Sequence, residues 1–88
     1  MQACSKYRKF FLDKYGYIFC ESCHISYAFK FEVHHLYHAS LFPRHKHLHD
    51  NENLIMLCDR CHSDFHAGKR KEEFKKLEKN RGLKKLFS

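Results

Sequence analysis

Residues 53–62 read NLIMLCDRCH, and this stretch decides the fold. An asparagine and a short apolar run predict a strand over its first five residues. The run leads directly into a Cys-x-x-Cys pair with a histidine behind it. We expect a helix to begin near Asp59 and to continue through His66, with Gly68 to stop or bend it. The stretch therefore predicts a strand that delivers two thiols to the start of a helix.

A second Cys-x-x-Cys pair, Cys20 and Cys23, lies upstream of Cys58 and Cys61. In each pair both sulfurs can reach one ion, and two pairs complete a tetrahedral thiolate site that suits Zn²⁺. Residues 24–57 separate the pairs, which is more than a compact zinc ribbon needs. The site has no open coordination position, so we expect its zinc to stabilise the fold. The alternative interpretation is four reduced cysteines in the core.

Short elements are expected around this centre. Residues 29–35 (FKFEVHH) alternate apolar and polar side chains, which is typical of a half-buried strand. Residues 36–52 are interpreted as a loop. Two helical stretches flank the core: residues 5–15, with Ser5 as the N-cap, and the basic C-terminal tail, helical over residues 69–80.

The composition limits the class of protein and its partners. The chain has 88 residues, of which 43% are apolar, and a net charge of +7 with a pI near 9.3. We expect a single domain over residues 1–88 with a core at about residues 18–67. The basic balance favours an anionic partner, nucleic acid before a membrane surface. The alternative is a merely soluble basic protein.

The sequence also gives an expectation about location. No apolar run approaches the ~18 residues of a membrane span, and the first ten residues lack the apolar core of a secretory signal. Four of the five cysteines fall into the two pairs, which favours metal chemistry in a reducing compartment. The fifth, Cys4, is expected to be a free thiol. We therefore expect a cytoplasmic protein with no membrane partner.

Polar residues that can carry chemistry stand at the ends of the predicted elements. They are His34, His35, Asn53, His62 and His66. Two histidines end the first strand, one follows the last zinc cysteine, and the last lies one helical turn further on the same face. The arrangement brings imidazoles from a strand end and from a helix around one point. That point can hold a second metal with open positions for phosphate and water.

These segments together resemble the HNH endonuclease family in its zinc-knuckle form. In order along the chain they are Cys20-x-x-Cys23, Glu32-Val33-His34-His35, Asn51-Glu52-Asn53-Leu54 and Cys58-x-x-Cys61-His62 with His66 behind it. The resemblance implies a small α+β fold. Its centre is a ββα-metal (treble-clef-like) motif stapled by the four-cysteine zinc site, with flanking N- and C-terminal helices. The loop after the second strand histidine lacks the glycine-rich segment of many members, so its path is not predicted.

The resemblance also implies a role for each residue of this constellation. His35 would be the general base, and His34 and His62 would ligate one catalytic divalent metal. His66 would be a further ligand or a phosphate contact, and Asn53 would brace the loop that orients the base or touch the metal. A histidine can accept a proton from water at neutral pH, and a cation stabilises the charge of the transition state. The expected ion is Mg²⁺, with Mn²⁺, Ni²⁺ or Zn²⁺ as alternatives.

Basic side chains are the predicted contacts to nucleic acid, DNA first. They are Arg44, Arg60, Lys69, Arg70, Lys71, Lys75 and Lys76. The alternative for the helical ones is a solvated face balanced by glutamates. His45, His47 and His49 are interpreted as a polar loop with some phosphate contact, and His24 and His38 as structural or solvated. No segment is suited to reading bases, so weak sequence preference is expected.

Together these features predict a metal-dependent endonuclease that hydrolyses DNA and nicks one strand per active site. A double-strand break would need a homodimer or a larger partner protein. Two alternatives stay open: a non-catalytic zinc module that binds nucleic acid or protein, and the same nuclease site acting on RNA. The biological role stays open among DNA packaging, restriction, homing and competition between genetic elements.

Overall fold

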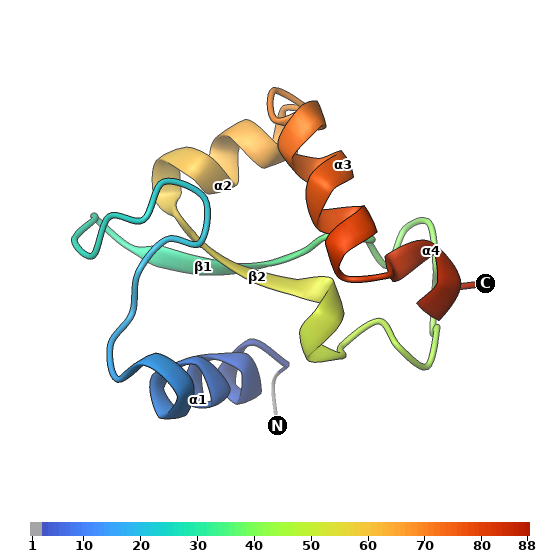
Figure 1. Ribbon diagram of the computed structural model, residues 1–88, viewed down its shortest axis with the longest axis horizontal. Coiled ribbons are helices and arrows are strands. Elements are labelled where there is room, and N and C mark those ends of the chain that lie inside the picture. The colour runs from blue at the N-terminus through green and yellow to red at the C-terminus, as the bar shows by residue number, and fades with distance from the viewer. Residues whose placement is uncertain (1–2) are drawn as a thin grey trace.

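A computed structural model of the chain describes residues 3–88, with side chains from residue 5 onward. It is a small α+β structure in which helices cover both faces of a two-stranded antiparallel sheet (Figure 1). The strands are β1 (Phe31–His35) and β2 (Leu54–Cys58). The helices are α1 (Ala3–Tyr15), α2 (Asp59–His66), α3 (Lys71–Asn80) and α4 (Leu83–Leu86), with a 3-10 turn, η1 (Asn51–Asn53), before β2. The order β1, β2, α2 confirms the expected ββα arrangement with flanking helices.

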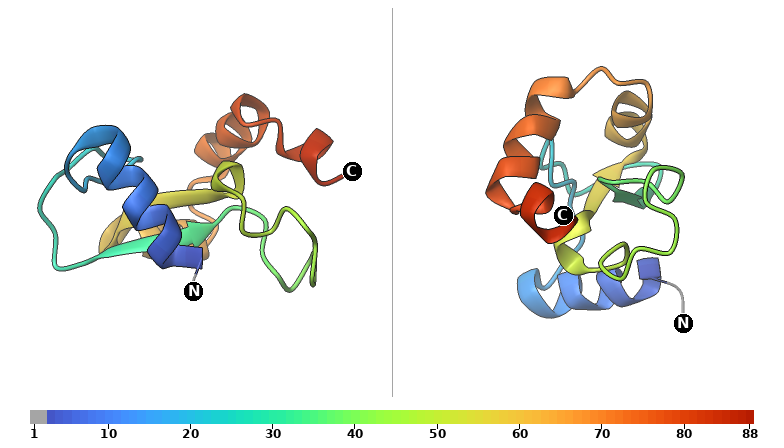
Figure 2. Two further views of the ribbon diagram at one scale, coloured as in Figure 1. Left: turned by 90° about the horizontal axis from the view of Figure 1, so that it is seen from below. Right: turned by 90° about the vertical axis from the view of Figure 1, so that its right-hand side faces the viewer.

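Strand β2 is buried along its whole length because packed elements cover both of its faces. Leu54 and Met56 pack against Phe11 of α1. Ile55 and Leu57 belong to a second cluster on the opposite face, toward α3 and α4. Figure 2 shows α1 crossing one face of the sheet while α3 and α4 lie on the other side. A strand covered on both faces has a continuous apolar sequence rather than an alternating one, which explains the LIML run.

Helix α1 starts earlier than expected. It begins at Ala3, so Ser5 lies inside the helix and the prediction that it is the N-cap was wrong. The helix extends upstream of Ser5 because Ala3 and Cys4 are both compatible with a helical backbone. Tyr7 and Phe11, one turn apart, are buried against the sheet. Gly16 ends the helix with a φ of 84°, a left-handed conformation that glycine adopts without steric cost.

The C-terminal segment contains one element that the sequence did not reveal. The predicted helix over residues 69–80 is present as α3, beginning at Lys71. Helix α4 follows, with Leu83 fully buried and Phe87 nearly so. Four residues are too few to form a helix on local propensity alone, so α4 depends on these tertiary contacts. No helix in the part of the chain that the structure describes is long and apolar enough to cross a membrane.

Candidate functional site

The four paired cysteines come together in one cluster. The ligand atoms of Cys20, Cys23, Cys58 and Cys61 all lie within 4.8 Å of one another. In each pair the backbone N–H of the second cysteine donates to the sulfur of the first, at 3.4 Å in both cases. Three of the thiols are buried, and burial raises the pKa of Cys61. Four convergent thiols, with no histidine or carboxylate among them, fit a structural zinc ion. The charge of the ion would stabilise the thiolates.

Arg70 lies beside this cluster. Its guanidinium donates to Asp64 at 3.0 and 3.2 Å, to Glu73 at 3.3 Å and to Ser22 at 3.1 Å. It also contacts Sγ of Cys61 at 3.8 Å. These contacts connect the start of α3 to the cysteine cluster. They occupy most of the N–H groups of Arg70, which the sequence analysis had assigned to nucleic-acid binding.

A second cluster joins the end of β1 to α2. One ring nitrogen from each of His34, His62 and His66 lies within 4.8 Å of the others. His62 and His66 are separated by one helical turn, and their ring centroids are 5.0 Å apart. His34 is the buried member, with 4% of its surface exposed, whereas His66 is exposed. The structure therefore brings the three histidines together at a site that is open on one side.

The charge state of this histidine triad suits a metal. Burial, with the neighbouring histidines next, lowers the pKa of His34 to about 3. Burial is also the main cause that lowers the pKa of His62. Neutral imidazoles keep a lone pair for a cation. Three ligands leave coordination positions for water and substrate, as in catalytic rather than structural sites.

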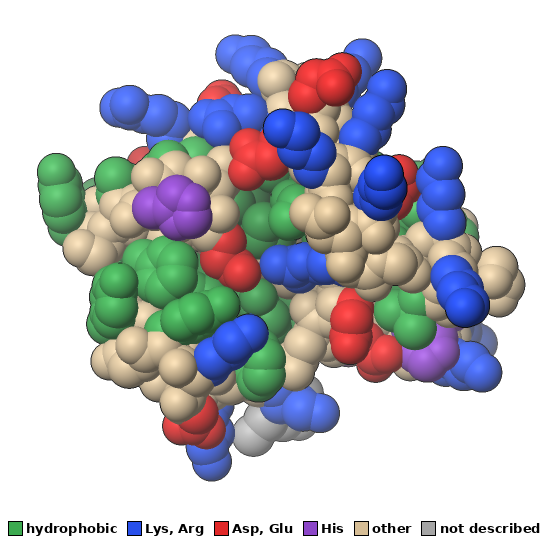
Figure 3. All heavy atoms as spheres, in the orientation of Figure 1, with side chains coloured by type: hydrophobic (Ala, Val, Ile, Leu, Met, Phe, Trp, Pro, Cys, Tyr) green, Lys and Arg blue, Asp and Glu red, His purple; other side chains and the backbone are tan. Residues whose placement is uncertain are grey.

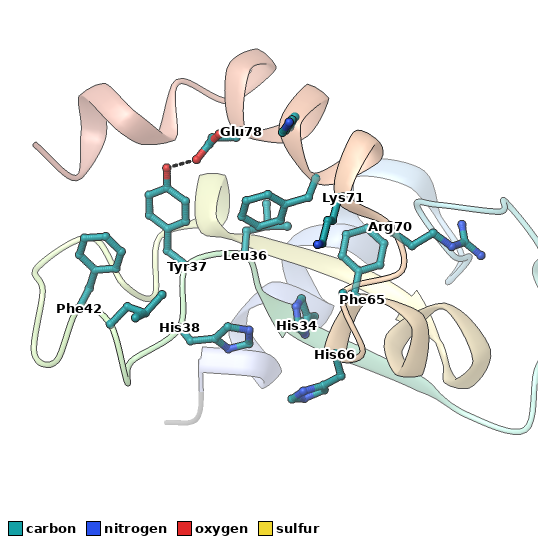
Figure 4. A pocket seen from close by; sticks show the side chains of 14 residues that line it. His34, Leu36, Tyr37, His38, Phe42, Phe65, His66, Arg70, Lys71 and Glu78 are labelled. Atoms are coloured by element: carbon teal, nitrogen blue, oxygen red, sulfur yellow. Dashed lines mark hydrogen bonds between the residues drawn. The ribbon is translucent and has the colours of Figure 1, made fainter.

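His38 lies beside the triad, although the sequence analysis interpreted it as structural or solvated. Its ring centroid is 4.9 Å from that of His34 and 5.8 Å from that of His66. Figure 4 shows the three rings gathered at one end of a pocket. The only sequence signal for His38 was the abundance of histidine in the loop, and that signal does not identify a position.

His35 does not join the triad. Successive strand residues point to opposite faces, so His35 and His34 diverge. Nε2 of His35 lies 3.0 Å from Nδ1 of His49, a loop residue. Burial, followed by His49, lowers the pKa of His35. The sequence analysis placed His49 in a polar loop with some phosphate contact and did not pair it with His35, because pairing across the loop depends on the path of the loop.

Asn53 is fully buried and hydrogen-bonded to the loop. Its Oδ1 accepts from the N–H of Tyr37 at 2.8 Å, and its Nδ2 donates to the carbonyls of Tyr37 and Leu48 at 3.0 and 2.8 Å. The backbone carbonyl of Asn53 accepts from Leu36 N–H at 2.8 Å. One side chain thus joins both ends of the segment between the strands. Oδ1 and both amide protons of Asn53 are used in these hydrogen bonds.

The predicted basic contacts other than Arg70 are exposed. They are Arg44, Arg60, Lys69, Lys71, Lys75 and Lys76. Figure 3 shows Lys and Arg side chains gathered around α3. The loop histidines are less free than expected: His45 stacks on Phe87 with centroids 4.4 Å apart, and His47 lies 2.6 Å from Asp50.

The comparisons with known proteins agree with this geometry. The family model for HNH endonuclease matches residues 20–68, which contain both metal clusters, the strand pair and α2. No curated protein and no solved structure matches the chain. Because the family model covers more than half of the sequence, the chain belongs to the HNH endonuclease family.

Proposed function

We propose that this protein is a metal-dependent endonuclease that hydrolyses phosphodiester bonds in DNA, one strand per active site. The observation that carries the proposal is the triad of His34, His62 and His66 next to a separate four-cysteine cluster. The four cysteines are sufficient for a zinc ion that only stabilises the fold, so the three histidines need a separate explanation. Membership of the HNH family supports nuclease chemistry.

The histidine triad would hold one divalent cation, Mg²⁺ first. A cation there would polarise the phosphoryl oxygens and stabilise the charge that develops on the leaving oxygen. His34 is fixed by burial in β1, and the other two ligands are one turn apart on α2. This rigid attachment keeps the three ring nitrogens convergent before an ion binds.

His35 would act as the general base at the end of β1. With Nε2 donating to Nδ1 of His49, Nδ1 of His35 would be the nitrogen that accepts the proton of a water molecule. The hydrogen bond at one ring nitrogen selects which nitrogen keeps the lone pair. The lowered pKa of His35 favours the neutral form that a base requires. His49 is therefore proposed as a positioning residue.

Asn53 would act through the loop rather than on the metal. Its amide holds the backbone at Tyr37 and Leu48, which are the two sides of the loop that carries His49. Of the two roles expected for this residue, bracing the loop therefore has the support of the hydrogen bonds.

The exposed basic residues would position the substrate through its phosphates. Those around α3 are Lys69, Lys71, Lys75 and Lys76, and Arg44 and Arg60 lie on the loop and at the start of α2. Such contacts carry little sequence information. One active site cuts one strand, so a double-strand break would require a homodimer or a partner protein.

The test is cleavage of supercoiled plasmid and of matched RNA by the zinc-loaded protein with Mg²⁺, Mn²⁺, Ni²⁺ or Zn²⁺. We expect nicked plasmid from the wild type and none from His35→Ala. His24→Asn is a matched control, because His24 is exposed and asparagine tolerates its left-handed φ of 67°. Cleavage of RNA but not of plasmid would show that the substrate is RNA. No cleavage of either polymer by folded, zinc-loaded protein would favour a binding module.

A further inference from the structure

A groove of about 630 Å³ opens beside the histidine triad, between the loop after β1 and helices α2 and α3 (Figure 4). His34 and His66 line one end of it. At the other end the Tyr37 hydroxyl donates a hydrogen bond to Glu78. The groove and the metal site therefore share two side chains, and whatever is bound by the triad lies at the mouth of the groove.

The walls of the groove are aromatic and apolar. Phe65 comes from α2, Phe74 from α3 and Phe42 from the loop. The rings of Tyr37 and Phe42 are stacked, with centroids 5.0 Å apart and an angle of 11° between their planes. A concave apolar site of this volume is in the range that holds a small organic ligand. Flat ring systems are the ligands that such walls contact best.

The rim of the groove is basic. Lys71 and Lys75 of α3 line it and are exposed. Its one carboxylate, Glu78, accepts the hydroxyl proton of Tyr37 at the end far from the triad. A ligand that fits this pattern has an aromatic part for the walls and negative charge for the rim and the metal end. A nucleotide has both.

We propose that the groove binds an unpaired nucleobase next to the phosphate being cut, so that the preferred substrate is single-stranded or locally unpaired nucleic acid. The inference rests on the proposed function, because the phosphate at the triad places the neighbouring nucleotide at the groove. A base inside a duplex faces its partner strand and reaches a pocket only by leaving the stack. Stacking on aromatic side chains needs no particular base, which agrees with the expected weak sequence preference.

The test measures binding without cleavage. A single-stranded oligonucleotide with one 2-aminopurine is titrated with zinc-loaded full-length protein in the absence of added Mg²⁺, and the same strand annealed to its complement is the comparison. We expect saturable quenching of the probe, with the single strand bound at least about 10-fold more tightly than the duplex, as stacking on aromatic groups allows.

Two groove variants make the test specific. Phe74→Leu removes one aromatic ring from the wall, and Leu41→Asp places a carboxylate at a lining loop position that is 73% exposed. Each is expected to weaken single-strand binding by about 10-fold. Phe29→Leu is the matched control, because Phe29 is 91% exposed and lies outside the groove. It is expected to bind as the wild type does.

Equal affinity for single strand and duplex would overturn the inference, and so would a folded Leu41→Asp variant that binds as tightly as the wild type. These results would leave the nuclease proposal standing if plasmid is cut. Conversely, the expected binding pattern without cleavage under any metal would support the groove and reject the nuclease. The two proposals thus fail separately.

Discussion

Nε2 of His35 lies 3.0 Å from Nδ1 of His49, and the centroids of the two rings are 5.2 Å apart. The pair links the last residue of β1 to the loop that leads into η1. A neutral imidazole has one N–H and one lone pair. When Nε2 of His35 donates to His49, its Nδ1 keeps the lone pair that a general base needs. In that arrangement the loop histidine would hold both the orientation and the tautomer of the proposed base.

Replacing His49 should slow the reaction without weakening substrate binding. We expect His49→Phe to lower kcat by about 10- to 100-fold, the usual cost of losing a supporting hydrogen bond at a catalytic centre. KM should change little. His49→Asn should recover part of the rate, because its Oδ1 can replace the acceptor at Nδ1. Steady-state kinetics of all three proteins measures this, and equal loss in both variants would assign His49 a purely structural role.

Removing a zinc ligand should unfold the core. Cys58 lies at the junction of β2 and α2 and is buried in the larger apolar cluster. Structural zinc contributes about 10–16 kcal/mol of binding free energy, which is comparable to the whole free energy of unfolding of a typical domain. We expect Cys58→Ser to lose both zinc and helical circular dichroism. Cys4→Ser is the control, since Cys4 is predicted to be a free thiol, and it should keep one tightly bound zinc.

Replacing the amide of Asn53 with an apolar side chain should destabilise the protein. Its amide makes three hydrogen bonds to the loop backbone, and the residue is fully buried. Asn53→Leu leaves these backbone groups unpaired, and we expect a loss of about 2–4 kcal/mol in the free energy of unfolding. Urea unfolding of the zinc-loaded protein measures it. Asn51→Leu, at an exposed position nearby, should change the stability by less than about 0.5 kcal/mol.

Two neighbouring basic residues should behave differently. Lys71 is exposed, so Lys71→Gln is expected to reduce the slope of log affinity against log salt by about 0.7–0.9, the value of one phosphate contact. Arg70 bonds Asp64, Glu73 and the cysteine cluster. Arg70→Gln should leave the salt slope unchanged and lower stability and zinc retention instead. Fluorescence anisotropy at several salt concentrations and unfolding curves distinguish the two. A changed salt slope in Arg70→Gln would return that residue to the nucleic-acid interface.

Most of the fold was predictable because local signals agree with the packing. The apolar run before Cys58 and the alternating run before His35 became the two paired strands. The spacing of the cysteines predicted the four-cysteine cluster that forms where β2 ends. Helix α4 was not predicted, because Leu83 and Leu86 form too short a pattern to identify a helix, and the burial of Leu83 depends on distant contacts. The start of α1 was missed because a serine that can cap a helix can also lie within one.

The candidate site was only partly predictable. His34, His62 and His66 stand at the ends of predicted elements, so their convergence follows from the order of those elements. His38 and His49 belong to a loop without periodicity, and their partners depend on the three-dimensional path that Asn53 holds in place. Arg70 could not be distinguished from its lysine neighbours by sequence, since its partners come from three separate segments: Ser22, α2 (Cys61 and Asp64) and α3 (Glu73).

The most direct test of the central claim is the rate at which zinc-loaded His62→Ala nicks supercoiled plasmid, compared with the wild type at equal Mg²⁺. His62 belongs to the triad and not to the cysteine cluster, so the variant should keep its zinc and its fold. The account predicts a rate at least about 100-fold below that of the wild type, equivalent to losing about 2.7 kcal/mol of transition-state stabilisation. An unchanged rate in the folded, zinc-loaded variant would contradict the claim that the three histidines hold a catalytic metal.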